Sequence, residues 1–251
     1  LSVCIYSHDL KQKIECSRIS DLEYNGDLDL IKSIARLIAP DFGFELEVGT
    51  DFPVGSGLGG SAALAVAIIG CFNEFRADPW SRHQIAEMAF QSERLNLGIA
   101  GGWQDQYAAA FGGFNYMEFS AEENLITPLR IEPNMLRELE ANLILCYTNK
   151  THSSGQIHAD QKQRVLSSEA AQAALQRQKG MTKDMKRRLL RGDIYGYGSL
   201  LHQAWLAKRE LSNLISDSDT DRIYDCAMAN GALGGKILGA GGGGYFMFFA
   251  P

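Results

Sequence analysis

The alternation of apolar and polar residues along the 251-residue chain predicts several short strands. Residues 1–20 are strand-like, and apolar and acidic residues alternate over residues 44–48. The second pattern is typical of a strand with one wet face in an antiparallel sheet. The unbroken apolar run at 143–147 predicts a buried strand that starts a second unit. We therefore expect a domain boundary near residue 140, with one domain over 1–140 and another over 141–251.

Helical periodicity and its end signals account for most of the remaining chain. Ser81 and Gln84 have the spacing of a capping box at the start of a helix that ends near Gly98. Gly112 and Gly113 close a short alanine-rich helix. Residues 114–119 alternate like a strand. The expected helices cover about 29–38, the apolar stretch 64–72, 81–97, 104–111, 135–141, 160–191, 193–215 and 219–230.

Composition and charge argue against two functional classes, nucleic-acid-binding and membrane-spanning proteins. The net charge of −6 argues against a nucleic-acid partner, which would require a basic face. No run of 18 apolar residues is present, so no membrane span is predicted. The five scattered cysteines are typical of reduced thiols in a cytoplasmic protein. The sequence does not decide whether the protein forms a homodimer. The chain starts at Leu1 within a strand-like pattern and ends at Pro251 after an apolar run, so we expect the natural protein to extend beyond both ends.

The most informative stretch runs from Pro53 to Ala63, with the sequence Pro-Val-Gly-Ser-Gly-Leu-Gly-Gly-Ser-Ala-Ala. Four of the six residues 55–60 are glycines, and an apolar helix follows directly. Backbone amides without side chains in front of them, at the positive end of a helix dipole, can surround an anion. A phosphate-binding loop is therefore predicted, in preference to a tight turn before a core helix.

Other nucleotide-binding loops fit this stretch less well. A Walker A loop ends in Gly-Lys-Ser/Thr, and the lysine is absent before Ser61. The glycine spacing of a dinucleotide fingerprint is present, but that loop follows a strand buried on both faces. The alternating strand 44–48 and the proline at 53 do not match this context. No Val-Ala-x-Lys strand follows, as it would in a protein kinase.

A second stretch offers the carboxylates that phosphoryl transfer requires. Asp105 lies at a predicted helix start beside Gly101 and Gly102, where substrate could approach the backbone. Glu93 lies at the end of the preceding helix, from which it could reach Ser61. Alternatively, Asp105 is a helix N-terminal acid and Glu93 a solvated charge. Together with the phosphate loop, the interpretation as a cation ligand and a catalytic carboxylate is favoured.

A second glycine-rich loop precedes the predicted last strand. Five of the six residues 239–244 are glycines, which suits a loop packed closely against a ligand or another loop. A flexible hairpin is the alternative interpretation.

These three stretches resemble the motifs of the GHMP small-molecule kinases. The resemblance implies an α+β fold with a ribosomal-protein-S5-like N-terminal domain and a ferredoxin-like C-terminal domain. It also implies Mg²⁺ on Ser61 and Glu93, and Asp105 as the catalytic carboxylate. Two departures are Gly60, where a serine is usual, and the absence of the family's N-terminal substrate loop, expected before Leu1. The ATP-binding residues would be Pro53, Gly55, Ser56, Gly57, Leu58, Gly59, Gly60, Ser61 and Ala62.

The segment from Gly98 to Phe119 is similar to the D-glycero-D-manno-heptose 7-phosphate kinases within that family. This similarity implies phosphorylation of the C1 hydroxyl of a sugar phosphate. Trp103 stands where lysine is usual and favours the alternative of a fucose-type 1-kinase. A sugar sensor without catalysis is a third alternative. The expected substrate contacts are Gly101, Gly102, Asp105, Lys150, His152, Gly239, Ala240, Gly241 and Gly242.

Overall fold

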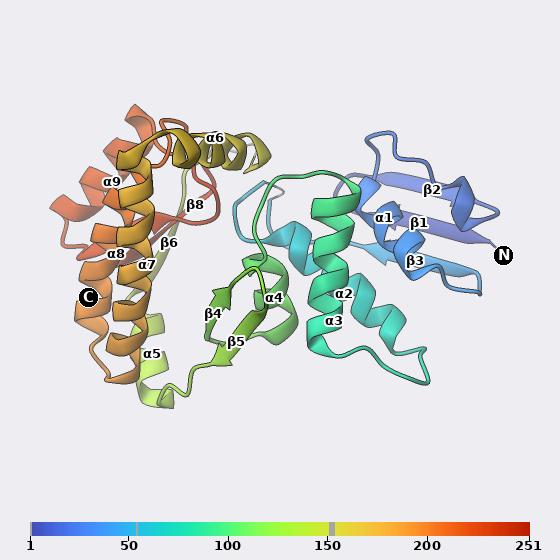
Figure 1. Ribbon diagram of the computed structural model, residues 1–251, viewed down its shortest axis with the longest axis horizontal. Helices are drawn as coiled ribbons and strands as arrows, with labels where there is room; N and C mark the ends of the chain where they lie inside the picture. The colour runs from blue at the N-terminus through green and yellow to red at the C-terminus, as the bar shows by residue number, and fades with distance from the viewer. Residues whose placement is uncertain (1, 54, 151–153) are drawn as a thin grey trace. The chain divides into compact units, whose positions relative to one another are not determined.

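The computed structural model describes residues 2–53, 55–150 and 154–251 (Figure 1). Its contacts divide the chain into two compact units. The domain boundary expected near residue 140 stays a prediction. The first unit comprises Leu1–Pro53, Gly59–Gly113 and Phe119–Ile126, and the second comprises Val54–Leu58, Phe114–Glu118 and Thr127–Pro251.

The sheet of the first unit has the strand order β2-β1-β3. Strand β1 (Val3–Ser7) pairs antiparallel with β2 (Gln12–Cys16) and parallel with β3 (Phe44–Val48). The prediction that residues 44–48 belong to an antiparallel sheet is therefore wrong. An edge strand keeps one solvent-exposed face whether its single neighbour runs parallel or antiparallel to it. The alternation of apolar and acidic residues therefore does not distinguish the two pairings. Both η1 (Ile19–Asp21) and α1 (Asp29–Ile38) lie in the connection that returns the chain parallel to β1.

Helices of the first unit follow the local sequence signals closely. Helix α1 has the predicted bounds, and α4 (Gln104–Phe111) ends at Gly112 as expected. The capping box of α3 (Arg82–Phe90) is present in both directions. Helix α2 (Gly60–Asn73) starts inside the glycine loop and buries Ala65, Ile68, Ile69 and Phe72 in the core.

In the second unit, β6 (Leu143–Tyr147), β8 (Tyr245–Phe249) and β7 (Gly234–Ile237) form an antiparallel sheet in the order β6-β8-β7. The expectation that β6 is buried is wrong, because Ile144 and Leu145 are 52% and 55% exposed. An apolar run does not reveal whether its strand lies at the centre or the edge of a sheet.

The predicted helix over 160–191 is two helices, α6 (Ser154–Ser167) and α7 (Glu169–Leu190). Ser168 separates the two helices by capping α7. Its hydroxyl accepts a hydrogen bond of 3.4 Å from the Ala171 amide.

A small two-stranded sheet also forms, and its second strand was not predicted. None of the described helices has both the length and the apolar character needed to cross a membrane. The remaining elements are β4 (Asn115–Phe119), β5 (Asn124–Pro128), α5 (Pro133–Ala141), α8 (Ile194–Arg209) and α9 (Ser218–Ala229).

Candidate active site

The glycine loop is built from backbone conformations that side chains disfavour. Gly55, Gly57 and Gly59 have φ values of 75°, 78° and 74°. Gly59 is the N-cap of α2 and contributes no side chain, so the amides of the first turn of α2 have no side-chain cap. Such amides, at the positive end of the helix dipole, are available to an anion. This geometry would suit a phosphate group, and phosphate binding by this loop stays a prediction.

The departure at Gly60 has a steric reason. A Cβ atom at this position would lie 2.7 Å from Cε2 of the Phe52 ring. A serine therefore requires Phe52 to move. The hydroxyl that remains, on Ser61, lies in the first turn of the exposed end of α2.

Ser61 reaches the buried carboxylate of Glu93. Its hydroxyl donates a hydrogen bond of 2.7 Å to Oε1 of Glu93, and Gln106 Nε2 donates one of 2.7 Å to Oε2. Arg94 Nη2 lies 3.6 Å from Oε2. Glu93 is only 3% exposed, which excludes the alternative of a solvated helix-end charge. The predicted approach of Glu93 to Ser61 is thus present in the structure.

Glu93 occupies a π-helix, η2 (Gln91–Asn96), that continues α3. Two hydrogen bonds support this widened turn: Ser92 Oγ donates to the Met88 carbonyl and Ser33 Oγ to the Ser92 carbonyl, each at 2.9 Å. π-Helical turns inside helices are rare and frequently lie at functional sites. This π-helical turn was not predicted, because it depends on Ser33 from a different helix.

Asp105 lies next to the end of the glycine loop. A Cβ on Gly59 would be 3.7 Å from Cγ of Asp105 and 3.8 Å from its Oδ1. Asp105 is in the first turn of α4, at the positive end of the helix dipole. The Trp103 ring stacks on Phe90, with centroids 3.4 Å apart and an angle of 8°, and so fixes the start of α4. Asp105, Ser61 and Glu93 therefore surround one end of the phosphate loop.

Arg94 lies against Gly101, one of the two glycines that precede α4. A Cβ at Gly101 would lie 2.4 Å from Cζ of Arg94, whose Nη1 donates to the Ala100 carbonyl at 3.3 Å. A larger residue at position 101 would therefore displace the Arg94 guanidinium, whereas a Cβ at Gly102 would meet nothing within 4 Å. Arg94 was not predicted as a site residue, although its position beside Glu93 in the sequence was an available signal.

The second glycine loop, residues 239–244, packs directly on the first half of the phosphate loop. A Cβ on Gly239 would lie 2.9 Å from the Gly57 carbonyl oxygen, and one on Gly244 would clash with the carbonyl oxygen of Ser56. The Gly242 amide donates to the Ile215 carbonyl at 2.8 Å. This backbone-to-backbone contact excludes the alternative of a free flexible hairpin. Ala240 is buried, and Gly241 lies against Ile215.

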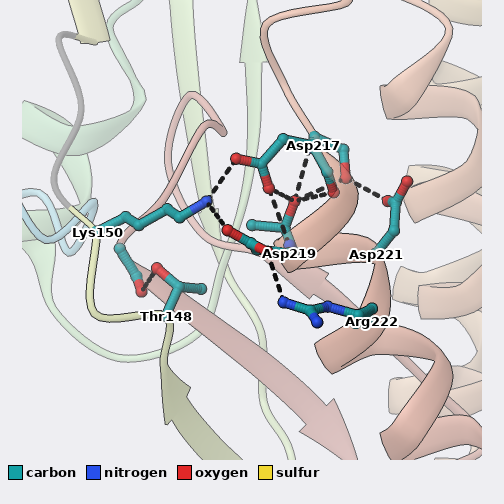
Figure 2. A network of polar contacts seen from close by, with 9 residues as sticks. Thr148, Lys150, Asp217, Asp219, Asp221 and Arg222 are labelled. Atoms are coloured by element: carbon teal, nitrogen blue, oxygen red, sulfur yellow. Dashed lines mark hydrogen bonds and ion pairs between the residues drawn. The ribbon is translucent and has the colours of Figure 1, made fainter.

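Lys150 is held by two aspartates near the start of α9 (Figure 2). Its Nζ lies 2.6 Å from Asp217 Oδ2 and 2.9 Å from Asp219 Oδ2. Hydrogen bonds to these carboxylates raise the pKa of Lys150, and the same ammonium lowers the pKa of Asp217 and of Asp219. These contacts were not predicted, because they join residues 67 and 69 positions apart. His152 lies outside the described residues.

Comparison with known proteins gives two family matches. The family described as GHMP kinases N terminal domain matches residues 29–113, and GHMP kinases C terminal matches residues 185–251.

Individual relatives include sugar kinases. A D-glycero-alpha-D-manno-heptose 7-phosphate kinase of Campylobacter jejuni is 41% identical over 231 residues, which are 90% of this chain and 68% of that protein. An L-fucokinase/L-fucose-1-P guanylyltransferase of Bacteroides fragilis is 31% identical over 84% of this chain, but this covers only 23% of that protein. The crystal structure of a D-glycero-D-manno-heptose 1-phosphate kinase from Bacteroides thetaiotaomicron superposes with a TM-score of 0.74 at 30% identity, over 99% of this chain and 72% of that one.

The buried pair of Gln106 and Glu93 gives a first prediction. Gln106→Leu removes a donor from a buried carboxylate and is expected to lower the free energy of unfolding by about 1–3 kcal/mol. Gln104→Leu, an exposed glutamine in the same helix, is the matched control and should change it by less than about 0.5 kcal/mol. Urea denaturation at pH 7 measures both. Equal effects of the two substitutions would contradict the importance of this hydrogen bond.

Proposed function

This chain belongs to the GHMP kinase family, and we propose that it transfers the terminal phosphate of ATP to a hydroxyl group of a sugar. The α+β class and the two GHMP domains expected from the sequence are confirmed by the family matches. One observation carries the proposed activity: Ser61, Glu93 and Asp105 gather at the end of a glycine loop that opens onto a helix. The two halves of a phosphoryl-transfer site, a phosphate cradle and carboxylates, are thus adjacent.

The acceptor that we propose is the C1 hydroxyl of D-glycero-D-manno-heptose 7-phosphate. The 41% identity to the Campylobacter jejuni heptose 7-phosphate kinase, over 90% of this chain, supports it. The alternative of a fucose-type kinase depended on Trp103. The stacking of Trp103 on Phe90 gives this ring a role in the start of α4 without any sugar. A sugar sensor is disfavoured because Ser61, Glu93 and Asp105 are all retained in position.

The residues present fit a Mg²⁺ ion carried by ATP. Ser61 Oγ and Glu93 Oε1 are hard oxygen ligands that lie 2.7 Å from each other. No group of three or more His, Cys, Asp or Glu that could hold a metal occurs among the described residues. Two protein oxygens complemented by phosphate oxygens and water are typical of Mg²⁺ in kinases. When bound, the ion would neutralise charge on the β- and γ-phosphates.

Asp105 would act on the sugar. Its carboxylate lies beside Gly59, so a hydroxyl bound there would be close to the phosphates on the loop. The carboxylate would accept the proton of the attacking hydroxyl and orient its oxygen toward the γ-phosphorus. The open surface at Gly102 leaves room for the sugar to approach the backbone. Arg94 and Gln106 keep Glu93 in place while this happens.

Binding of the 7-phosphate by Lys150 and His152 stays a prediction. The ammonium of Lys150 already contacts Asp217 and Asp219, so a phosphate dianion would have to share it with two carboxylates. A cytoplasmic location and a homodimer likewise stay predictions.

A coupled assay of ADP release tests the proposed function directly. Heptose 7-phosphate, fucose and galactose are offered in parallel to the protein with Mg²⁺ and ATP. Turnover with heptose 7-phosphate at least tenfold above the other two sugars is expected. Absence of turnover with every sugar, despite measurable ATP binding, would favour the sensor.

Asp105→Asn is expected to lower kcat by about 10²–10⁴-fold, the usual range for a positioned acid–base group. The amide retains the shape but cannot take the proton. The KM for ATP should change less than threefold. Asp78→Asn, an exposed aspartate of the same unit, is the control and should retain full activity. Turnover by Asp105→Asn within a factor of three of the parent would exclude this role.

Ser61→Ala and Glu93→Gln are each expected to raise the Mg²⁺ concentration at half-maximal rate by about tenfold, since each removes a hard oxygen ligand or its charge. The control Glu74→Gln removes an exposed charge from the end of α2. Magnesium titrations at saturating ATP and sugar measure the effect. If both substitutions leave the titration unchanged, the cation is bound by other residues.

The opposing effects of Lys150→Ala and Asp219→Asn test whether Lys150 binds the substrate phosphate. Removal of the ammonium should raise the KM for heptose 7-phosphate by roughly tenfold, the cost of one charged hydrogen bond. Asp219→Asn should lower the same KM, because it frees part of the charge of Lys150. Steady-state kinetics with varied sugar measure both. Unchanged KM values for heptose 7-phosphate in both variants would show that Lys150 does not bind the substrate phosphate and only contacts the aspartates near the start of α9.

A further inference from the structure

Lys208 is a buried lysine that the proposed chemistry does not use. It lies in the last turn of α8 and is 8% exposed. Its Nζ donates to the carbonyls of Ile237, at 3.3 Å, and of Gly239. Within the described residues, no carboxylate lies within ion-pair distance of it. Two carbonyl dipoles and the negative end of the α8 dipole therefore replace the usual acidic partner.

The carbonyls that Lys208 contacts are at the end of β7 (Ile237) and at the start of the second glycine loop, residues 239–244 (Gly239). Gly239, the first residue of this loop, packs on the backbone of Gly57 in the phosphate loop. The far end of the loop is fixed separately, by a hydrogen bond of 2.8 Å from the Gly244 amide to the Lys150 carbonyl. Gln161 Nε2 donates to the Ala240 carbonyl at 3.3 Å. Lys208 thus supplies a charged side-chain contact at the end of the second glycine loop that packs on the phosphate loop.

We propose that Lys208 is a positioning residue for phosphoryl transfer: its ammonium holds Gly239, and through Gly239 the backbone of Gly57, in the shape that binds the triphosphate. The inference rests on the proposed kinase function. Glycine loops have little intrinsic rigidity, so an external anchor is needed wherever their amides must be preorganised for an anion. A charged donor to two carbonyls is a stronger anchor than a neutral one.

Lys236 provides a matched control. It lies on β7, one residue before Ile237, and its charge is close enough to contribute to lowering the pKa of Lys208, after the larger effect of burial. Among the described residues, the side chain of Lys236 has no hydrogen bond or ion pair. Removing either lysine removes one positive charge near the loop, but only removal of Lys208 breaks its contact with Gly239. The comparison separates positioning from a general electrostatic attraction of ATP.

The experiment compares Lys208→Met, Lys236→Met and Lys208→Arg in the full chain. Lys208→Met is expected to raise both the KM for ATP and the calorimetric Kd for ATP about tenfold or more. The KM for the sugar should stay within twofold. Lys208→Arg, which retains charge and donors, should recover at least part of the affinity, and Lys236→Met should change it less than twofold. Hydrogen exchange of residues 239–244 should accelerate in Lys208→Met alone.

Several outcomes would overturn the inference. Equal weakening of ATP binding by Lys208→Met and Lys236→Met would show a charge effect without positioning. Unchanged ATP binding in Lys208→Met would show that the loop holds its shape without the anchor. Lys208→Gln, which keeps one neutral donor, replaces the methionine variant if that variant does not fold, under the same criteria. ATP binding by the parent protein without any sugar turnover would count against the kinase function, and the calorimetric comparison would still test the role of Lys208.

Discussion

The buried carboxylate of Glu93 is the constraint on which the first unit's site depends. A charge removed from water has to be compensated by hydrogen bonds, or folding becomes costly. Glu93 obtains these from Ser61 at the start of α2 and from Gln106 in α4, with Arg94 close by. Three helical segments must therefore meet at one point. Asp105, the neighbour of Gln106, is brought beside Gly59 as a consequence of the same arrangement.

A different constraint organises the glycine loops of the second unit. Hydrogen bonds orient Glu93, whereas steric exclusion decides which residues the loops can contain. The Gly239 and Gly244 positions leave no space for a Cβ beside Gly57 and Ser56. Glycine makes the close approach feasible but does not by itself hold it, because its backbone is the least restricted of all residues. The anchors outside the loops, Lys208 among them, supply the order that glycine lacks.

Local sequence signals predicted the elements that depend on neighbours in the chain. The capping box of α3 and the bounds of α1 and α4 follow from such signals. The parallel pairing of β3, the exposure of β6 and the π-helical turn at Glu93 depend on distant residues, and they were predicted wrongly or not at all. The same distinction applies within the site. Ser61, Glu93 and Asp105 were predicted from motifs, and Arg94 was missed although it adjoins Glu93 in the sequence. The contacts of Gln106 with Glu93 and of Lys150 with its aspartates were not predicted, since contacts between distant residues leave no periodic pattern.

The hydrogen bond between Ser61 and Glu93 has a consequence for the order of ligand binding. At 2.7 Å, the serine hydrogen lies between the two oxygens that a cation would use. A cation can bind them only after this hydrogen has turned away, at a cost of about 1 kcal/mol. Two ligands do not repay the dehydration of Mg²⁺, which binds through one or two protein oxygens only when phosphate oxygens complete its shell. The proposed site would therefore favour Mg²⁺ already bound to the triphosphate over the free ion. In the proposed mechanism the phosphate loop would supply the binding energy, and the pair of Ser61 and Glu93 would then position the cation.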